Sequence, residues 1–254
     1  MNTPVAVEAS ADAAQDVVAM AQCLNLDLVA PGSETTAFLL QLRNGRWQLQ
    51  QTGASAPGPV FVDFVSGKAA YRRHQGEGRK TPLARALGMK PDFTPRVVDG
   101  TAGLGQDAFV LATLGCQVTL IEQSPIVHAL LADGLARAAE DDLVRPIVER
   151  MSLIQANTID YLQQLSPEQY PDAIYLDPMY PHRGKNALSK KEMQSFQKLL
   201  GEDRQGAEML NIARQRVCKR VAVKRPVKAG FLGDETADFQ ILRPKIRFDV
   251  YLSK

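Results

Sequence analysis

From residue 96 onward, short apolar runs alternate with longer stretches that have a helical pattern. The apolar runs have strand length and occupy residues 96–99, 117–122, 152–155 and 172–177. The helical stretches lie between them, at residues 106–114, 125–139 and 158–165. Strands that alternate with helices through short turns predict a parallel, doubly wound sheet.

The last part of the chain changes this pattern. It predicts helices at residues 190–200 and 206–217, a strand at 220–224, and two closing strands at 239–242 and 247–252. The closing strands are near enough in sequence to form an antiparallel hairpin. A mainly parallel sheet that ends in such a hairpin is the architecture of Rossmann-like class I methyltransferases, which depend on S-adenosylmethionine (SAM). It differs from the all-parallel α/β sheet that binds dinucleotides.

The first 90 residues have a weaker pattern, which predicts a small α+β region. The expected elements are a helix at 13–23, a hairpin of strands 36–43 and 46–50 around Asn44-Gly45, a strand at 60–65 and a short helix at 81–87. Prolines between residues 91 and 95 mark the expected boundary. We therefore predict a small N-terminal region over residues 1–90 and a SAM-dependent methyltransferase domain over residues 91–254.

The composition is that of an ordinary globular protein. Of the 254 residues, 45% are hydrophobic and 23% are charged, which excludes disordered and fibrous classes. The net charge of +2 does not by itself indicate a polyanionic partner. Three widely separated cysteines are typical of free thiols in a reducing compartment, and no His or Cys has a partner at metal-ligand spacing. Without a signal peptide or an apolar run of membrane-spanning length, we expect a cytoplasmic protein with no membrane partner and no metal.

A glycine turn joins the first strand of the alternating pattern to the helix that follows it. Gly103 and Gly105 would let the backbone pass close to a ligand, and the helix start presents N–H groups at its positive dipole end. Residues 103–108 also fit the loose dinucleotide-binding pattern G-x-G-x-x-A. Because this pattern is weak on its own, a tight turn without a ligand remains the alternative.

The next two strand ends carry groups that suit an adenosine-type ligand. Glu122 ends the second strand about twenty residues after the glycine turn, where a carboxylate can accept hydrogen bonds from both ribose hydroxyls. The alternative for Glu122 is a surface acid that caps the next helix. Asn157 follows the third strand, where it could cap a helix, reach the adenine edge, or do both. These residues predict adenosine binding without separating NAD from SAM.

The fourth strand ends abruptly in Asp177-Pro178-Met179-Tyr180. Hydrogen bonds from a flat amino group to the Asp177 carboxylate and the Pro178 carbonyl would localise the nitrogen lone pair and aim it at a methyl donor. Tyr180 would stack on the base, so that catalysis is mostly orientation. Dehydrogenases do not need this motif, so it favours SAM and predicts catalytic roles for Asp177, Pro178 and Tyr180. The alternative is a helix-capping Asp followed by a proline turn.

Three basic clusters are predicted to flank this loop. They contain Arg72 and Arg73, then His182, Arg183 and Lys185 directly after the loop, and Lys224 and Arg225 at a strand end. Side chains of these types would contact the phosphates of a nucleic-acid substrate. Basic residues elsewhere, such as Arg204, Arg214 and Arg216, are interpreted as a solvated helix surface.

Together these motifs resemble the RsmJ family, the bacterial small-subunit ribosomal RNA guanine-N2 methyltransferases. The resemblance covers nearly the whole chain and rests on residues 61–64, 72–73, 97–99, 101–105, 175–182, 190–193, 223–226 and 247–249. The Asp-Pro-Met-Tyr-Pro-His string at 177–182 is more specific than the Asp-Pro-Pro-Tyr motif found across amino-methyltransferases.

The resemblance implies SAM as methyl donor and one guanine of 16S ribosomal RNA, free or in the assembled small subunit, as target. By position, it implies cofactor contacts at Gln106, Asp107, Glu122, Gln123, Asn157, Thr158 and Asp177. The family often has arginine where this chain has Gln106, so a charged contact to the cofactor carboxylate would be missing or replaced by the helix start. Three alternatives stay open: methyl transfer to adenine N6 or a protein amide, a nicotinamide-dependent oxidoreductase, and a catalytically silent RNA-binding protein.

Overall fold

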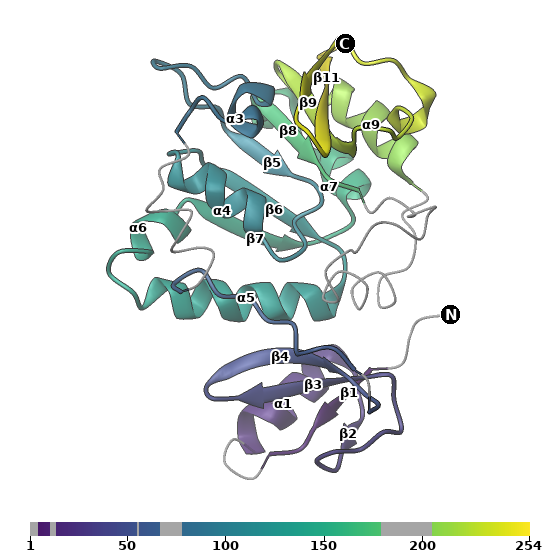
Figure 1. The fold of residues 1–254 in the computed structure, drawn as a ribbon. Coiled ribbons are helices and arrows are strands. Elements are labelled where there is room, and N and C mark those ends of the chain that lie inside the picture. Colours follow the sequence, from purple (N-terminus) through teal and green to yellow (C-terminus); the bar gives the residue numbers. More distant parts are fainter. Residues whose placement is uncertain (1–4, 11–13, 55, 67–77, 179–204) are drawn as a thin grey trace.

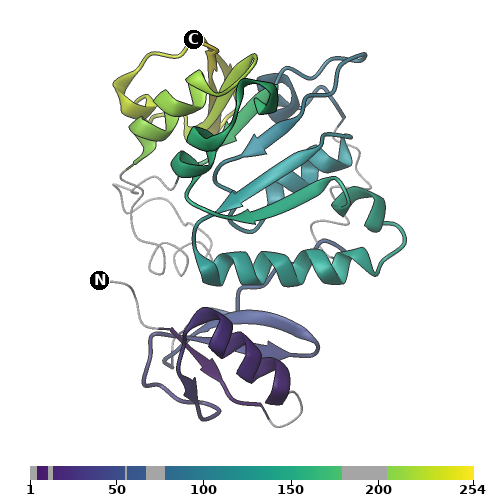
Figure 2. The same cartoon turned by 180° about the vertical axis from the view of Figure 1, so that it is seen from behind.

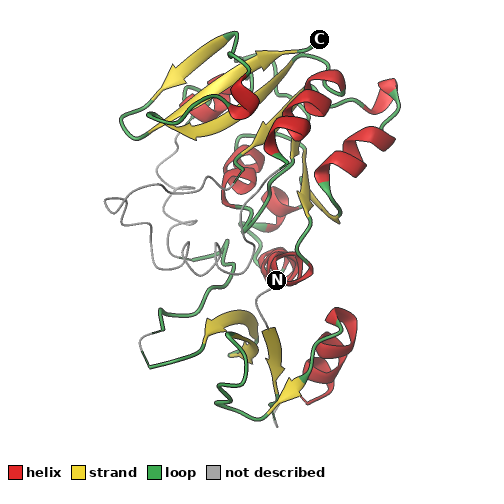
Figure 3. Cartoon of the chain, turned by 90° about the vertical axis from the view of Figure 1, so that its right-hand side faces the viewer, coloured by secondary structure: helices red, strands yellow, loops and turns green. Residues whose placement is uncertain are grey.

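A computed structural model describes residues 5–10, 14–54, 56–66, 78–178 and 205–254 of the chain (Figure 1). Two sheets organise these residues, one of four strands and one of seven. The helix α5 (Pro125–Ala139) lies between them, where it contacts strands of both (Figures 1 and 3). The helix expected at residues 190–200 lies outside the described residues.

The larger sheet confirms the predicted architecture. Its strands are β5 (Val97–Asp99), β6 (Val118–Glu122), β7 (Met151–Gln155), β8 (Ala173–Leu176), β9 (Arg220–Pro226), β10 (Phe239–Leu242) and β11 (Ile246–Leu252). They lie in the order β10-β11-β9-β8-β5-β6-β7, and β5 to β9 run parallel. Only β11 runs against its neighbours, β9 and β10, so the parallel sheet ends in the expected antiparallel hairpin.

Helices cover both faces of this sheet, which explains why its strands read as continuous apolar runs. Their bounds are α3 (Pro82–Ala86), α4 (Gln106–Thr113), α5, α6 (Arg145–Val148), α7 (Thr158–Gln164) and α9 (Gly206–Gln215), with short 3₁₀ turns at Pro167–Gln169 and Leu232–Asp234. Val97 belongs to a core with residues of α3, α4 and α5, whereas its neighbour Val98 belongs to a second core with α7 and α9. Successive strand residues therefore pack on opposite faces.

The N-terminal region forms the smaller sheet. It contains β1 (Val5–Glu8), α1 (Ala14–Leu24), β2 (Leu28–Val29), β3 (Phe38–Arg43) and β4 (Arg46–Gln51), with strand order β2-β1-β3-β4 (Figure 2). The predicted β3–β4 hairpin is confirmed, and Asn44 and Gly45 both have the positive φ that a tight turn of this kind requires (51° and 70°). The short strands β1 and β2 were not predicted.

The expected strand at residues 60–65 is wrong. Only Val60 pairs, in an isolated bridge with Leu49, and Asp63 then accepts hydrogen bonds from two backbone N–H groups in a local turn. Val62 and Phe64 are buried, and Val62 lies so close to Gly134 of α5 that a Cβ there would come within 2.3 Å of it. The alternation of apolar residues therefore serves packing on a helix rather than a strand ladder.

The short helix α3 begins and ends as the sequence predicts. Thr81 caps it by accepting the Ala84 N–H at 3.2 Å, and Gly88 ends it with φ 77°. This helix contacts β10 and β11 of the larger sheet. The division of the chain at residue 90 stays a prediction.

Candidate active site

Acidic side chains gather where the parallel strands of the larger sheet reach their carboxyl ends. Asp99 is the last residue of β5, Glu122 is the last of β6, and Asp177 follows β8 directly. Asp107 joins them from the first turn of α4. Ligands of open α/β sheets bind at this edge, because loops and helix N-termini meet there.

The glycine turn brings Glu122 into a fixed position. Gly103 and Gly105 have φ values of 52° and 69°, which favour glycine, and a Cβ on Gly105 would lie 2.8 Å from Leu131. The Glu122 carboxylate accepts hydrogen bonds from the Gly103 N–H at 3.0 Å and the Ser124 N–H at 2.7 Å. Burial raises the pKa of Glu122, and these N–H donors act against that shift.

The residue that caps α5 is Ser124, whose hydroxyl accepts from the Val127 N–H. The alternative role of Glu122 as the cap of that helix is therefore not what the structure shows. Each oxygen of the Glu122 carboxylate keeps a second lone pair, so it can still accept from ribose hydroxyls. That cofactor contact, like the one expected at Gly103, stays a prediction.

Asn157, Gln123 and Thr158 lie near one another beyond β6 and β7. The Asn157 carbonyl oxygen accepts from the Ile159 N–H at 2.8 Å and caps α7, while its amide nitrogen lies 3.4 Å from the Gln123 side-chain oxygen. Thr158 is 5% exposed, and its hydroxyl donates to the Gly100 carbonyl at 2.5 Å. The helix-cap role of Asn157 is thus observed, and the adenine contact remains compatible with it. Thr158 holds the glycine turn, and its cofactor contact stays a prediction.

Asp177 is held by its backbone and its side chain. Its N–H donates to the Thr101 hydroxyl at 2.6 Å, and its Oδ2 accepts from Lys224 Nζ at 2.8 Å. The same ammonium group donates to Asp107 Oδ2 at 2.8 Å, and the Tyr175 hydroxyl donates to that oxygen at 2.7 Å. The Asp177 side chain is still 39% exposed, so its burial is only partial.

The charges in this cluster shift the acidity of its members. Burial raises the pKa of Asp99 to about 8, and the nearby charges of Asp107 and Asp177 add to that shift. Burial also raises the pKa of Asp177, while Lys224 opposes this. Burial alone would lower the pKa of Lys224, but Asp177 and Asp107 outweigh it and raise that pKa above its usual range.

Sequence reasoning missed part of this cluster. Tyr175 was seen only as a buried strand residue, and Asp99 only as the end of a strand. A usable signal was the strand register, since β5 and β8 are adjacent and Asp99 pairs with Tyr175. Lys224 was expected to contact phosphate, yet it lies between two carboxylates.

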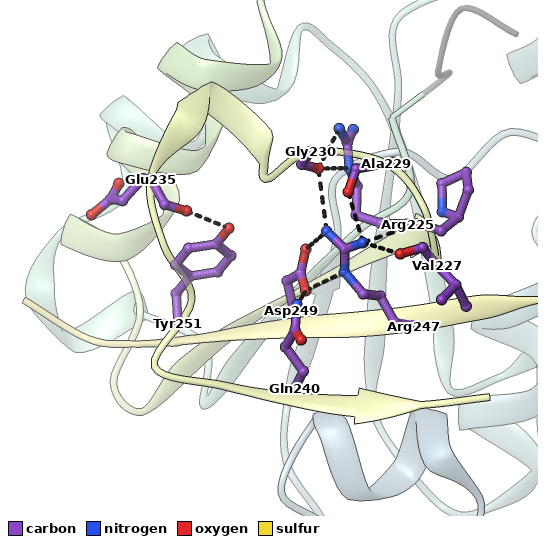
Figure 4. Close-up of polar contacts among 10 residues, drawn as sticks. Arg225, Val227, Ala229, Gly230, Glu235, Gln240, Arg247, Asp249 and Tyr251 are labelled. Atoms are coloured by element: carbon purple, nitrogen blue, oxygen red, sulfur yellow. Dashed lines mark hydrogen bonds and ion pairs between the residues drawn. The ribbon is translucent and has the colours of Figure 1, made fainter. Parts of the chain in front are cut away.

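The predicted RNA-contacting residues fall into two groups. Arg225 is 5% exposed, and its guanidinium donates to the Gly230 carbonyl at 3.0 Å, next to the Arg247–Asp249 ion pair (Figure 4). This placement favours a structural role, which holds the loop after β9, over a phosphate contact. The second group lies outside the described residues and contains Arg72, Arg73, His182, Arg183 and Lys185. The predicted stacking residue Tyr180 also lies outside them.

Two remaining expectations concern Pro178 and Gln106. Pro178 is buried directly after Asp177, and Gln106 is exposed at the first position of α4.

Among the described residues there is no group of three His, Cys, Asp or Glu side chains that could hold a metal ion. In that same part of the chain, no helix has the length and apolar character needed to cross a membrane.

Comparison with known proteins identifies the family. A family model described as "Putative SAM-dependent methyltransferase" matches residues 20–253. The chain is similar to ribosomal RNA small subunit methyltransferase J of Nitrosococcus oceani, with 48% identity over 91% of each chain. It is 46% identical to the protein of that name from Cellvibrio japonicus, over 96% of each chain. The chain belongs to the ribosomal RNA small subunit methyltransferase J family.

A solved structure agrees with this assignment. A SAM-dependent methyltransferase from Neisseria gonorrhoeae superposes with a TM-score of 0.76 at 34% identity, over 97% of this chain and 95% of the other. The predicted enzyme class and cofactor are therefore confirmed, and the nicotinamide-dependent alternative is wrong.

The acidic edge fits SAM better than a dinucleotide. The methyl-bearing sulfur of SAM is positively charged, whereas NAD carries a pyrophosphate. The carboxylates of Asp107, Glu122 and Asp177 outnumber the Lys224 ammonium group that lies among them, so this edge would attract the sulfonium and repel the pyrophosphate. The donors and acceptors of the described residues thus suit the cofactor that the family uses.

Proposed function

We propose that this enzyme transfers a methyl group from SAM to the exocyclic N2 amino group of a specific guanosine in 16S ribosomal RNA. The observation that carries the proposal is the position of Asp177 at the edge where the cofactor turn lies: its backbone N–H donates to the Thr101 hydroxyl, and its carboxylate accepts from Lys224. The RNA substrate is inferred from the names of the similar proteins, which are small-subunit ribosomal RNA methyltransferases.

Bound SAM supplies a methyl group on a positively charged sulfur. We propose that Glu122 holds its ribose and that Asn157 and Gln123 hold its adenine, with the helix start at Gln106 and Asp107 beside its remaining polar groups. These roles are supported by the position of the side chains along the carboxyl edge.

Asp177 would orient the amino group and take its proton. A guanine amino nitrogen is a poor nucleophile because its lone pair is delocalised into the ring. Hydrogen bonds from its two protons to the Asp177 carboxylate and the Pro178 carbonyl localise that pair, and stacking by Tyr180 keeps the base in line. As the carbon–nitrogen bond forms, the bond from the methyl carbon to the cofactor sulfur would break and leave its electron pair on sulfur. The methylated nitrogen would then give one proton to Asp177, which is exposed enough to pass it to solvent.

The RNA partner must present its guanine outside the base stack. Turning a base out costs a few kcal/mol, which phosphate contacts from basic side chains offset. Arg72, Arg73, His182, Arg183 and Lys185 remain our candidates for those contacts. We also propose a cytoplasmic location, because small ribosomal subunits are assembled there in bacteria.

Methyl transfer from labelled SAM tests this proposal. The acceptors are assembled small ribosomal subunits, naked 16S RNA and DNA, followed by nucleoside analysis. We expect label as N2-methylguanosine in an RNA acceptor and none in DNA. Label on adenine N6 or on a ribosomal protein would replace the proposed target with another amino group. Cofactor binding without transfer to any acceptor would support the catalytically silent alternative.

A further inference from the structure

Lys224 occupies a position that phosphate binding does not explain. Its ammonium nitrogen lies 2.8 Å from Asp107 Oδ2 and 2.8 Å from Asp177 Oδ2. The lysine side chain is only 25% exposed, so little of it is available to a substrate backbone. One cation is thus shared between the start of α4 and the end of β8.

Strand register places Lys224 there. Val223 pairs with Leu176, so the next residue of β9 stands level with Asp177, the next residue after β8. Because Val223 packs in the core that contains α7 and α9, Lys224 points to the opposite face, where α4 lies. Tyr175 is in the core on that face as well, and its hydroxyl meets the same Asp107 oxygen that Lys224 binds.

We propose that Lys224 is a positioning residue for methyl transfer: its ammonium group keeps the Asp177 carboxylate anionic and fixed, while Asp107 and Tyr175 hold the ammonium group. This inference rests on the proposed function, because it assigns Asp177 the task of accepting the amino hydrogens. It replaces the phosphate contact that the sequence predicts for Lys224.

The surroundings of Asp177 show why a cation is needed. Burial and the nearby Asp107 carboxylate favour its protonated form, and Tyr175 and Asp99 also face this cluster. Lys224 and, more weakly, Arg225 favour the anion, but the Arg225 guanidinium is directed to the Gly230 carbonyl. Without Lys224, Asp177 would hold a proton to higher pH, and a protonated carboxyl cannot take another from the substrate.

The pH dependence of methyl transfer tests this role. Rates are measured on small ribosomal subunits at saturating SAM. The acidic limb is the part of the pH–rate profile where the rate rises with pH as Asp177 loses its proton. For Lys224→Met we expect this limb to shift upward by about one pH unit. The rate should therefore fall at acidic and neutral pH and return toward the wild-type rate at higher pH. Lys224→Arg keeps the charge and should keep the limb near its wild-type position.

The opposite change provides a second variant. Asp107→Asn removes a negative charge from beside Asp177 and leaves Lys224 to that carboxylate, so we expect the acidic limb to move to lower pH. A general loss of structure would not move the acidic limb in opposite directions in the two variants, so opposite shifts would support the proposed role of Lys224. If Lys224→Met does not fold, Lys224→Arg and Asp107→Asn still test the proposal.

Lys219→Met is the matched control, because Lys219 precedes the same strand and pairs with Asp172 at 3.7 Å at the other edge of the sheet. It should leave the limb unmoved. The inference would be overturned if the acidic limb were unshifted in both Lys224→Met and Asp107→Asn. It would also be overturned if the only effect of Lys224→Met were a salt-dependent rise in KM for RNA, because that is the signature of a lost phosphate contact. The proposed function fails separately, if wild-type enzyme labels no guanosine.

Discussion

Asp172 and Lys219 meet at the amino edge of β8 and β9, and Asp177 and Lys224 meet five residues further along each strand, at the carboxyl edge. At the amino edge the ion pair is 3.7 Å long and the lysine is 48% exposed. At the carboxyl edge the distance is 2.8 Å and the lysine is 25% exposed. The same two residue types therefore form a solvated surface pair at one end and part of a polar cluster at the other.

Their neighbours explain the difference. Asp172 also accepts from the Arg96 N–H at 2.9 Å, and Lys219 lies over the Phe93 ring at 3.5 Å, so this pair ties strands and loops together. The carboxyl-edge pair meets a further carboxylate, Asp107, beside the glycine turn. Helix N-termini and strand-end loops converge only at that edge, which is why a reactive site can form there.

The largest effect is expected for Asp177→Ala. It removes the acceptor of the amino hydrogens, so methyl transfer at saturating SAM should fall by about 10²–10⁴-fold or more, with the protein still folded. Asp172→Ala, at the amino edge, should keep its rate within about twofold of wild type. Initial rates with labelled SAM measure both. Full activity in Asp177→Ala would contradict the mechanism.

Glu122→Gln extends the comparison to β6. The glutamine amide has no charge and one acceptor oxygen fewer, so it binds both the ribose hydroxyls and the N–H groups of the turn more weakly. The Kd for SAM should therefore rise by about 10- to 100-fold, which is the effect of losing one or two charged hydrogen bonds. Glu149→Gln, an exposed residue just before β7 at the amino edge, is the control and should bind SAM normally. Isothermal titration calorimetry gives both constants, and equal values would rule out the ribose contact.

Tyr175→Phe removes a partly buried hydrogen bond to the Asp107 carboxylate. The loss should lower the free energy of unfolding by about 1.5–3 kcal/mol, because the acceptor is charged and Tyr175 itself is only 1% exposed. Tyr170→Phe loses a contact between its hydroxyl and Arg216 at the amino edge. Both residues are only half-buried, so water can replace the contact and about 0.5 kcal/mol or less is expected. Urea unfolding compares the two. A loss for Tyr175→Phe as small as that expected for Tyr170→Phe would mean that this carboxyl-edge hydrogen bond adds little to stability.

Asp99 predicts a pH dependence of stability. Its folded-state pKa of about 8 exceeds the usual 3.8, so between these values the folded state holds a proton that the unfolded state releases. The free energy of unfolding should therefore fall as pH rises through this window, by up to about 1.4 kcal/mol per pH unit from this group. Asp99→Asn should flatten that fall between pH 5 and 8. Parallel curves for variant and wild type would contradict the shift.

The smallest effect is expected for Lys219→Met. An exposed ion pair contributes about 0–1 kcal/mol, so thermal unfolding should change by a few degrees at most. Activity should not change. A loss of methyl transfer here would show that the amino edge also takes part in the reaction.

The sequence predicted the fold well because strand and helix periodicity are local. The β3–β4 hairpin follows from Asn44-Gly45, and the alternation from residue 96 predicts the parallel strands and the helices of the larger sheet. The expected strand at 60–65 failed because alternation reports which side chains are buried. Here Val62 packs on α5 and Phe64 stacks on Phe109 of α4, instead of joining a ladder.

The candidate site was predicted only in part for a related reason. Asp177 and Glu122 stand at strand ends, which the pattern locates. Lys224 meets Asp107 across 117 residues of sequence, and that meeting depends on strand register and on which face each residue takes. A basic residue near a catalytic loop was therefore assigned to phosphate, although the fold turns it toward carboxylates.

The most direct test of the central claim is to quantify N2-methylguanosine formed on small ribosomal subunits by wild-type enzyme, Asp172→Ala and Asp177→Ala. Mass spectrometry of the digested RNA provides the measurement. The account predicts that wild type and Asp172→Ala form this nucleoside and that Asp177→Ala does not. Equal amounts from all three, or a different methylated nucleoside from wild type, would contradict it.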